Sequence, residues 1–239
     1  MNTNAFRKNI LFAGAAMAAL ISGNSYAQMF TVKVDNLTNG IYFTPMLVAA
    51  HPSTTHVFQP GQAASVSLRA MAEGGDISGL TTDLMTASAT ITAANTSPLG
   101  PGGSVTTAMI SPPAANTNLS IVGMLLPTND GFVGMDNMEI PSAVGVYTYY
   151  LNAYDAGTEA NDEKIFAGGG TPGVQGIPAC PGSDCGTGGT GVAVSDTNSV
   201  VHIHRGTLGD TNSTGGASDL DSTAHRWLNP VARVTITVN

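Results

Sequence analysis

The sequence predicts an all-β protein with the architecture of a β-sandwich. Nine short segments carry the apolar or alternating pattern of strands, and Asn, Gly or Pro residues bound them. Signals for helices are few by comparison. Short strands separated by turn residues are typical of two packed β-sheets, so a sandwich is the expected architecture.

The predicted strands show two kinds of pattern. Residues 29–34 and 64–68 alternate apolar and polar side chains, whereas residues 41–50 are mostly apolar. The full set of predicted strands is 29–34, 41–50, 64–68, 105–110, 119–126, 144–151, 192–194, 200–204 and 231–238. Residues 78–94 place apolar side chains among many threonines, a pattern that leaves open a short helix or a loop with a strand after it.

Two segments have the composition of surface loops. Residues 168–191 are mostly Gly, Pro, Ser and Thr, so they bury too little apolar surface to form a core element. We expect a long surface insertion there and a second polar loop over residues 210–221. The chain has two cysteines, Cys180 and Cys185, and both lie in the first loop. In an exported protein such a pair is expected to form a disulfide that closes a small loop.

The first 27 residues have the features of a signal peptide. Arg7 and Lys8 precede an apolar run over residues 10–21, and Ser25 and Ala27 occupy the small-residue positions of a signal peptidase site. The run is shorter than the ~20 apolar residues of a bilayer span. We therefore expect cleavage after Ala27 and export, either to the periplasm or to the cell surface and medium.

The remaining chain, residues 28–239, has a length that suits one all-β domain. It contains no further segment long and apolar enough to span a membrane. Removing residues 1–27 takes away two basic residues and no acid, so the formal charge moves from −8 to −10. The basic residues that remain are scattered, which argues against nucleic acid or anionic lipid as a partner.

Two acidic, glycine-rich turns carry the strongest functional signal. The first contains Asp130 and Asp136, and the second contains Asp155 and Glu159. Carboxylates beside Gly, Asn and Thr are the oxygen ligands that a β-scaffold offers to Ca²⁺. Asp beside Gly is also a common turn former without any metal, and from the residues alone turn capping is the preferred interpretation.

These turns also carry a family resemblance. Residues 72–76 (AEGGD), 127–136 (PTNDGFVGMD) and 155–159 (DAGTE) are similar in order and spacing to the successive motifs of the spondin N-terminal domain family, which includes small secreted bacterial proteins. Residues 36–40 and 231–238 resemble the first and last strands of that family. The resemblance implies a C2-like antiparallel β-sandwich with one calcium ion held at one end by Asp130 and Asp155, and it reverses the preference for turn capping.

The chain departs from the family pattern near the expected ion. Gly131 stands where the family has Trp, and Thr128 and Asn129 replace Ser and Pro. Near Ser111 there is no acid, although animal members supply a further carboxylate at that point. This absence weakens the expected site. Glu159, Asp136, backbone carbonyls and water are the candidates to replace the missing ligand.

A second hypothesis rests on His202 and His204. Two residues apart on a strand, they project from the same face, as two imidazoles do when they bind zinc or copper. A third ligand would have to come from a further histidine, His51, His56 or His225, or from a carboxylate. We favour two histidines on the solvated face of a strand end. The nucleophile elbow, the phosphate loop and the HExxH motif are absent from the sequence.

Taken together, these patterns predict an exported, non-enzymatic, calcium-binding β-sandwich. By resemblance, its expected role is adhesion or recognition at the cell surface or in the periplasm, with a protein or a glycan surface as partner. Two alternatives stay open. One is a metalloenzyme that uses His202 and His204, and the other is a structural surface protein in which calcium only stabilises the fold.

Overall fold

A computed structural model of the chain describes residues 28–195 and 199–239. The predicted signal peptide, residues 1–27, lies outside the described residues. The strands are β1 (Phe30–Asn36), β2 (Tyr42–Phe43), β3 (Leu47–His51), β4 (Thr90–Ala93), β5 (Ser104–Thr106), β6 (Asn118–Leu126), β7 (Gly131–Glu139), β8 (Gly145–Asp155), β9 (His202–Ile203) and β10 (Ala232–Val238). Two short helices, α1 (Val66–Gly74) and α2 (Ser78–Thr86), separate β3 from β4.

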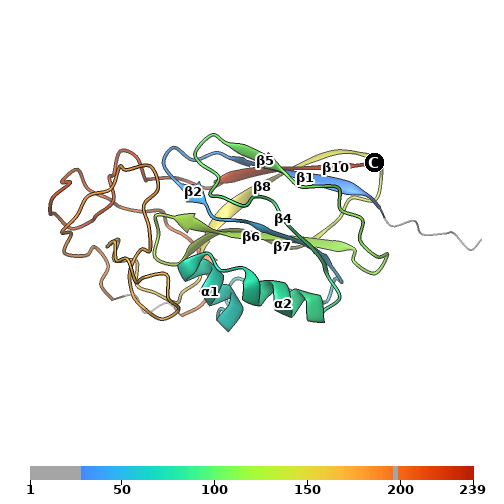
Figure 1. The fold of residues 1–239 in the computed structure, drawn as a ribbon, viewed down its shortest axis with the longest axis horizontal. Helices are drawn as coiled ribbons and strands as arrows, with labels where there is room; N and C mark the ends of the chain where they lie inside the picture. Colours follow the sequence, from blue (N-terminus) through green and yellow to red (C-terminus); the bar gives the residue numbers. More distant parts are fainter. Residues whose placement is uncertain (1–27, 196–198) are drawn as a thin grey trace, which may run out of the picture.

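The strands form one ten-stranded sheet in the order β4-β3-β6-β7-β8-β10-β1-β5, with β2 beside β6 and β9 beside β8. Every pairing between these strands is antiparallel, which confirms the predicted all-β class (Figure 1). The two halves of the sheet enclose one core, because Val32 and Ile236 from one half pack in the same buried cluster as Val48 and Ile121 from the other. The curled sheet therefore supplies both layers of the sandwich.

A second core lies between the helices and the outer face of β3, β6 and β7. Leu68 and Met71 of α1 and Leu84 of α2 belong to the same buried cluster as Val122 and Met124 of β6. As a result β6 is covered on both faces, and all of its residues are buried. Burial on both faces explains why residues 119–126 are almost all apolar, with Ser120 as the exception.

The predicted strand over residues 64–68 is wrong, because this segment begins α1. Ser65 caps the helix: its hydroxyl accepts a hydrogen bond from the backbone N–H of Leu68 (3.0 Å). Leu68 and Met71 then face the second core. Five alternating residues fit the start of an amphipathic helix as well as a strand, so the pattern alone does not distinguish the two. Residues 192–194, also predicted as a strand, form none.

Residues 78–94, left open by the sequence, form α2 followed by β4. In contrast, the sequence does not predict β7, because residues 127–136 have the composition of a turn. The turn itself is short, and Gly131 already begins β7. Gly134 lies inside this strand where the ring of Phe58 crosses it, and a Cβ there would meet the Phe58 ring at 2.8 Å.

Long loops occupy the end of the sheet where β8 finishes, opposite the C-terminus (Figure 1). We call residues 156–195 and 204–231 the loop layer. The two predicted loops pack on one another there: the backbone N–H of Gly186 donates to the carbonyl of Asp219 (2.7 Å), and that of Gly191 to the carbonyl of Ala217 (2.8 Å). The expected Cys180–Cys185 disulfide is confirmed. Within the described residues, no helix has the length and apolar character needed to cross a membrane.

Candidate metal centre

Asp130 and Asp155 meet at the end of the sheet that faces the loop layer. Asp130 directly precedes β7, and Asp155, the last residue of β8, pairs with Gly131. The backbone N–H of Ala156 donates to the carbonyl oxygen of Asp130 (3.2 Å). The hydroxyl of Thr128 fixes the turn before β7, because it accepts from the N–H of Gly131 (3.0 Å) and donates to a carbonyl of β6. The structure therefore brings the two principal predicted ligands together.

The two carboxylate oxygens of Asp130 have different surroundings. Oδ2 accepts hydrogen bonds from the backbone N–H groups of Thr158 (2.7 Å) and Glu159 (3.1 Å) and from the Thr158 hydroxyl (3.2 Å). Oδ1 is buried and has no hydrogen-bond partner among the described residues. A buried carboxylate oxygen without a partner is costly, since it has lost its water. Oδ1 of Asp130 is thus the atom best prepared to take a cation.

Asp155 is buried as well and holds the segment that follows it. Its Oδ1 accepts from the backbone N–H of Gly157 (2.8 Å), and its Oδ2 accepts from the side-chain amide of Asn161 (2.7 Å). Nε2 of His202, on the neighbouring strand β9, lies 3.7 Å from Oδ2. These donors leave carboxylate lone pairs available, because each ionised oxygen accepts more than one bond.

Glu159 contributes a third buried carboxylate close by. Its Oε2 accepts from the backbone N–H of Gly176 (3.1 Å) and lies 3.4 Å from the side-chain amide of Asn129, whereas Oε1 is buried without a partner in the described part of the chain. Burial raises the pKa of Glu159 to about 8, and the negative charges of Glu73 and Asp130 act in the same direction.

The electrostatics of this region favour a cation. Burial raises the pKa of Asp130 to about 7, and the negative charge of Asp155 adds to the effect, against the lowering influence of the hydrogen bonds from residues 158 and 159. The Lys and Arg ion pairs found among the described residues involve Asp35 and Glu73, and none reaches Asp130, Asp155 or Glu159. A divalent ion would compensate the negative charge that no side chain compensates.

The ligand set is nevertheless open. Among the described residues, the single set of three His, Cys, Asp or Glu side chains whose ligand atoms all lie within 4.8 Å of one another is Cys180, Cys185 and His225. Asp130, Asp155 and Glu159 are not drawn that close. The three carboxylates alone therefore do not form a complete calcium site, and the chain has no acid near Ser111 that could be added to them. Calcium would need backbone carbonyls and water to complete its coordination.

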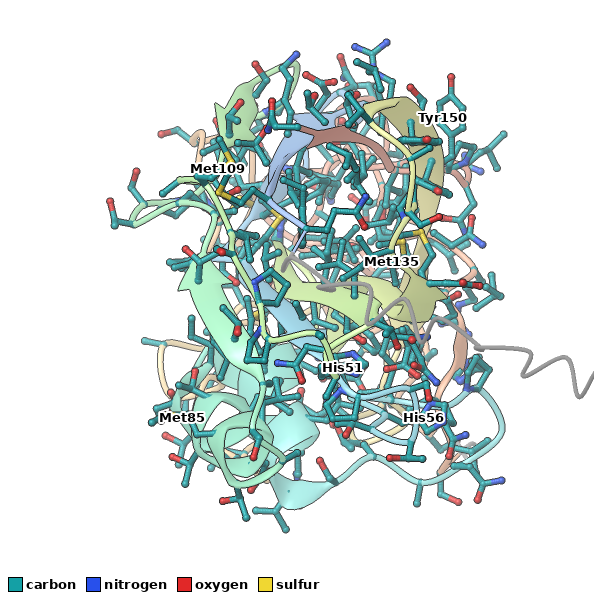
Figure 2. The ribbon with its side chains drawn as sticks, turned by 90° about the vertical axis from the view of Figure 1, so that its right-hand side faces the viewer. His51, His56, Met85, Met109, Met135 and Tyr150 are labelled. Atoms are coloured by element: carbon teal, nitrogen blue, oxygen red, sulfur yellow. A yellow bond between two sulfur atoms is a disulfide. The ribbon has the colours of Figure 1, made fainter. Side chains whose placement is uncertain are left out.

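Asp136 does not join this group. It lies on β7 five residues beyond Gly131, a separation of about 16 Å along an extended strand. Its Oδ1 accepts from the backbone N–H of Val57 (2.6 Å) and the hydroxyl of Ser120 (3.1 Å), and its Oδ2 lies 2.6 Å from Nδ1 of His56. Asp136 therefore anchors the segment after β3; Figure 2 labels His56 in this region.

The histidines do not assemble a transition-metal site within the described chain. His202 contacts Asp155. His204 is buried, packs on the indole of Trp227 (ring centroids 5.0 Å apart) and accepts the N–H of Gly206 at Nδ1 (3.0 Å), so the expectation that both histidines lie on a solvated face is wrong for His204. The three candidates for a third ligand lie elsewhere: His51 bonds Ser120, His56 bonds Asp136, and His225 faces the disulfide. Among the described residues, no His, Cys, Asp or Glu joins both His202 and His204 in a set whose ligand atoms all lie within 4.8 Å of one another, so the third ligand that the metalloenzyme hypothesis requires is not present there.

Sequence reasoning missed the polar residues that connect the site to the loop layer. The amide of Asn129 donates to Oδ1 of Asp162 (2.9 Å), and its oxygen accepts from the N–H of Glu163 (3.2 Å). Glu163 is buried and accepts from the N–H groups of Leu208 (2.6 Å) and Gly209 (2.8 Å). The run Asn161-Asp162-Glu163, two positions after Glu159, was the available signal, but its contacts are set by distant loop backbone.

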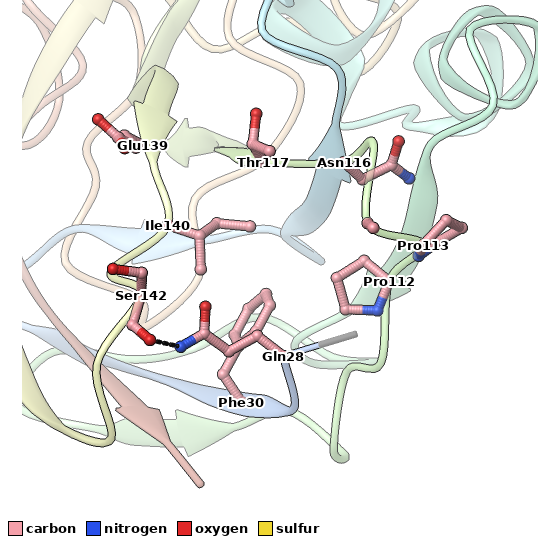
Figure 3. A pocket seen from close by; sticks show the side chains of 10 residues that line it. Gln28, Phe30, Pro112, Pro113, Asn116, Thr117, Glu139, Ile140 and Ser142 are labelled. Carbon is pink, nitrogen blue, oxygen red and sulfur yellow. Dashed lines mark hydrogen bonds between the residues drawn. The ribbon is translucent and has the colours of Figure 1, made fainter. Parts of the chain in front are cut away.

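A cavity of about 200 Å³ lies at the opposite end of the sheet (Figure 3). Phe30, Pro112, Pro113 and Ile140 give it an apolar lining, with Glu139 and Gln28 among the polar residues. Gln28 closes one side by donating from Nε2 to the carbonyl of Ser142 (2.5 Å). The cavity lies beside the start of β1, so it is remote from Asp130 and Asp155.

Comparison with known families gives a match in the same part of the chain as this site. A family model described as Spondin_N matches residues 19–163, which is more than half of the 239 residues. The matched segment includes the hairpin of β6 and β7, all of β8, and the three carboxylates of the candidate centre. No curated protein matches the chain.

Proposed function

The chain belongs to the spondin N-terminal domain family, and from this premise we propose that it is an exported, non-enzymatic recognition module. In this proposal Asp130 and Asp155 hold one calcium ion, and the loop layer beside them presents a surface to a protein or glycan partner. The ion would supply positive charge between two buried carboxylates. The partner would be met in the periplasm or at the cell surface.

One observation carries the calcium proposal. Asp130 is fully buried, its Oδ1 has no partner among the described residues, and the negative charge of Asp155 raises its pKa further. An arrangement of this kind disfavours the ionised carboxylates in the absence of a counter-charge. Calcium accepts carboxylate, carbonyl and water oxygens in flexible geometry, which suits an open set of oxygen ligands.

Asp130 and Asp155 each hold a different part of the segment that follows β8. Through Oδ2, Asp130 already fixes the backbone of residues 158 and 159, and Asp155 fixes Gly157 and Asn161. Neutralising the charge between the two acids would lock the turn before β7 to the segment after β8. Because that segment leads directly into the loop layer, calcium would order the surface on which recognition depends.

Family membership and the acidic charge of the chain support a recognition role over a role in nucleic acid binding. The runner-up is a structural surface protein in which calcium stabilises the fold and no partner binds at the loop layer. The two differ in whether calcium changes only the stability of the protein or also its binding to exposed surfaces of proteins and glycans.

Thermal unfolding in excess chelator and with calcium restored tests the metal part of the proposal. We expect calcium to raise the unfolding midpoint of the wild type, since an ion that binds only the folded state stabilises it by mass action. An Asp130→Asn, Asp155→Asn double variant should lose this response. Asp83→Asn, which removes an exposed carboxylate on α2, is the matched control and should retain it. A wild type whose midpoint is unchanged by calcium would contradict the proposal.

A further inference from the structure

A buried histidine faces both sulfurs of the disulfide in the loop layer. Cys180 and Cys185 are five positions apart and half-buried. Nε2 of His225 lies 3.9 Å from Sγ of Cys185 and 4.0 Å from Sγ of Cys180. His225 is almost completely buried, and its backbone carbonyl accepts the hydroxyl of Thr207 (2.8 Å), which fixes the backbone at this position.

The hydrogen bonds of His225 determine which ring nitrogen carries the proton. The backbone N–H of Asp221 donates to Nδ1 (3.1 Å), so Nδ1 must present a lone pair. A neutral imidazole then carries its proton on Nε2, which points at the two sulfurs. Burial lowers the pKa of His225 and keeps the ring neutral, although Asp184, Asp221 and Glu163 act in the opposite direction.

We propose that Cys180–Cys185 is a redox-active disulfide, open to reduction by low-molecular-weight or protein dithiols, and that His225 promotes its exchange by donating a hydrogen bond to the departing thiolate. A thiolate of the reductant attacks one sulfur, the S–S bond breaks, and its electron pair stays on the other sulfur, next to Nε2–H of His225. The second thiol of the reductant then attacks the mixed disulfide. The protein ends with two thiols, and the reductant ends as its own disulfide.

The placement of the disulfide fits exchange better than a purely mechanical role. The bond closes a loop of only a few residues and connects no distant parts of the sheet. Cys180 and Cys185 are partly accessible, and Ser183 and Asp184 between them are exposed, so a thiol reagent has a route to the sulfurs. The bond between Gly186 and Asp219 would still hold the loop in place once the disulfide opens.

The reduced pair with His225 also resembles a zinc ligand set, because the three ligand atoms lie within 4.8 Å. A metal at Nε2 would require the ring proton to move to Nδ1, where the N–H of Asp221 already donates. The geometry therefore favours a hydrogen bond to sulfur over metal coordination.

The rate of reduction tests this proposal. For the folded wild type treated with dithiothreitol at pH 7, we expect reduction at least about tenfold faster than for His225→Phe, because a stabilised leaving thiolate departs faster. His225→Gln, which keeps an N–H donor near the sulfurs, should recover part of the rate. His56→Gln, remote from the disulfide, should leave it unchanged. Equal rates for the wild type and a folded His225→Phe variant would overturn the proposal.

A second measurement uses the wild type alone and does not depend on whether any variant folds. The alkylation rate of the reduced protein against pH reports the pKa of the more reactive thiol. We expect that pKa to lie below the ordinary value of about 8.5. The charged groups with the largest effect on His225 are the acids Asp184, Asp221 and Glu163, which would oppose such a shift in a neighbouring thiol, so the Nε2–H donor would have to account for it. A pKa at or above the ordinary value would contradict a stabilising hydrogen bond from His225.

Discussion

Asp130 and Asp155 are placed together by strand pairing, since Asp155 pairs with Gly131, the residue directly after Asp130. The β6–β7 hairpin and the end of β8 thus set two buried carboxylates beside each other before any loop contributes. Each carboxylate also holds the backbone of the loop that follows β8. Asp130, Gly131 and Asp155 consequently determine both the register of β7 and β8 and the negative charge of the site.

We predict that Asp130→Asn separates the effect of charge from the effect of shape. In chelator the variant should be as stable as the wild type or more stable by about 1 kcal/mol, because it removes one of two like charges in a buried space. An amide oxygen at the Oδ2 position can still accept the N–H groups of Thr158 and Glu159. With calcium the order should reverse, since the variant loses a charged ligand.

Urea unfolding of both proteins with and without calcium measures the two differences. If Asp130→Asn were several kcal/mol less stable than the wild type in chelator, the carboxylate would be required by the fold itself, and the repulsion between Asp130 and Asp155 would be insignificant.

We predict that Asp136→Ala lowers the stability without changing the calcium response. Asp136 accepts the N–H of Val57 and the hydroxyl of Ser120, and removing it leaves buried donors unpaired, at about 1–3 kcal/mol. Because Asp136 lies far along β7 from Asp130, the calcium-induced shift in midpoint should equal that of the wild type. A reduced shift would place Asp136 in the ligand set.

Gly131 offers a test of how closely the turn is packed. A Cβ at this position would lie 2.7 Å from Oγ1 of Thr128 and 3.1 Å from Cδ2 of His204. We predict that Gly131→Ala lowers the free energy of unfolding by about 1–3 kcal/mol through overpacking and weakens calcium binding by moving Asp130. Gly215→Ala is the control, because its nearest neighbour would be 3.4 Å away. Equal stabilities for the two variants would contradict the prediction.

The sequence was sufficient to predict the β class and most strands, because these depend on local pattern and on turn residues. The pair Asp130 and Asp155 was expected only from the family resemblance, because the pairing of β7 with β8 that joins them is not a local pattern. The sequence did not reveal the structural role of Asp136, because its partners Val57 and Ser120 come from distant parts of the chain. The same holds for His225, since its position beside the disulfide results from contacts between two loops. Patterns within a segment report which face is buried, but not which distant backbone lies against it.

The start of α1 shows how a short pattern misleads. Residues 64–68 alternate like a strand, yet the hydroxyl of Ser65 pairs with the N–H of Leu68 and starts a helix. We predict that Ser65→Ala lowers the stability by about 1 kcal/mol, as loss of an N-cap usually does. Ser65→Asp should retain most of the stability, because Asp is an equally good cap. Chemical denaturation of the three proteins checks this, and equal stabilities for Ser65→Ala and the wild type would exclude the cap as a determinant.

The pair Asp35 and Arg233 gives a prediction for the dependence on pH. These residues face each other across β1 and β10, and Nε of Arg233 donates to Oδ2 of Asp35 (2.9 Å). Burial opposes the charge of Asp35, but hydrogen bonds from Lys33 and Arg233 outweigh burial and hold the pKa of Asp35 below its usual value of 3.8. The unfolded state therefore binds more protons than the folded state in the window just below that value.

The sign of the effect follows from this difference. The stabilisation by Asp35 is present above about pH 4 and is lost as the pH falls through the lowered pKa. We predict that Arg233→Met is less stable than the wild type by under about 1 kcal/mol at pH 7, since Arg233 is half-exposed. The difference should shrink below pH 3, whereas a Thr235→Val control on the same face should show a difference that does not change with pH. Other acids titrate equally in the wild type and in Arg233→Met, so their effects cancel in the comparison. If the difference in stability between these two proteins stayed constant down to pH 2, the ion pair would be excluded as its cause.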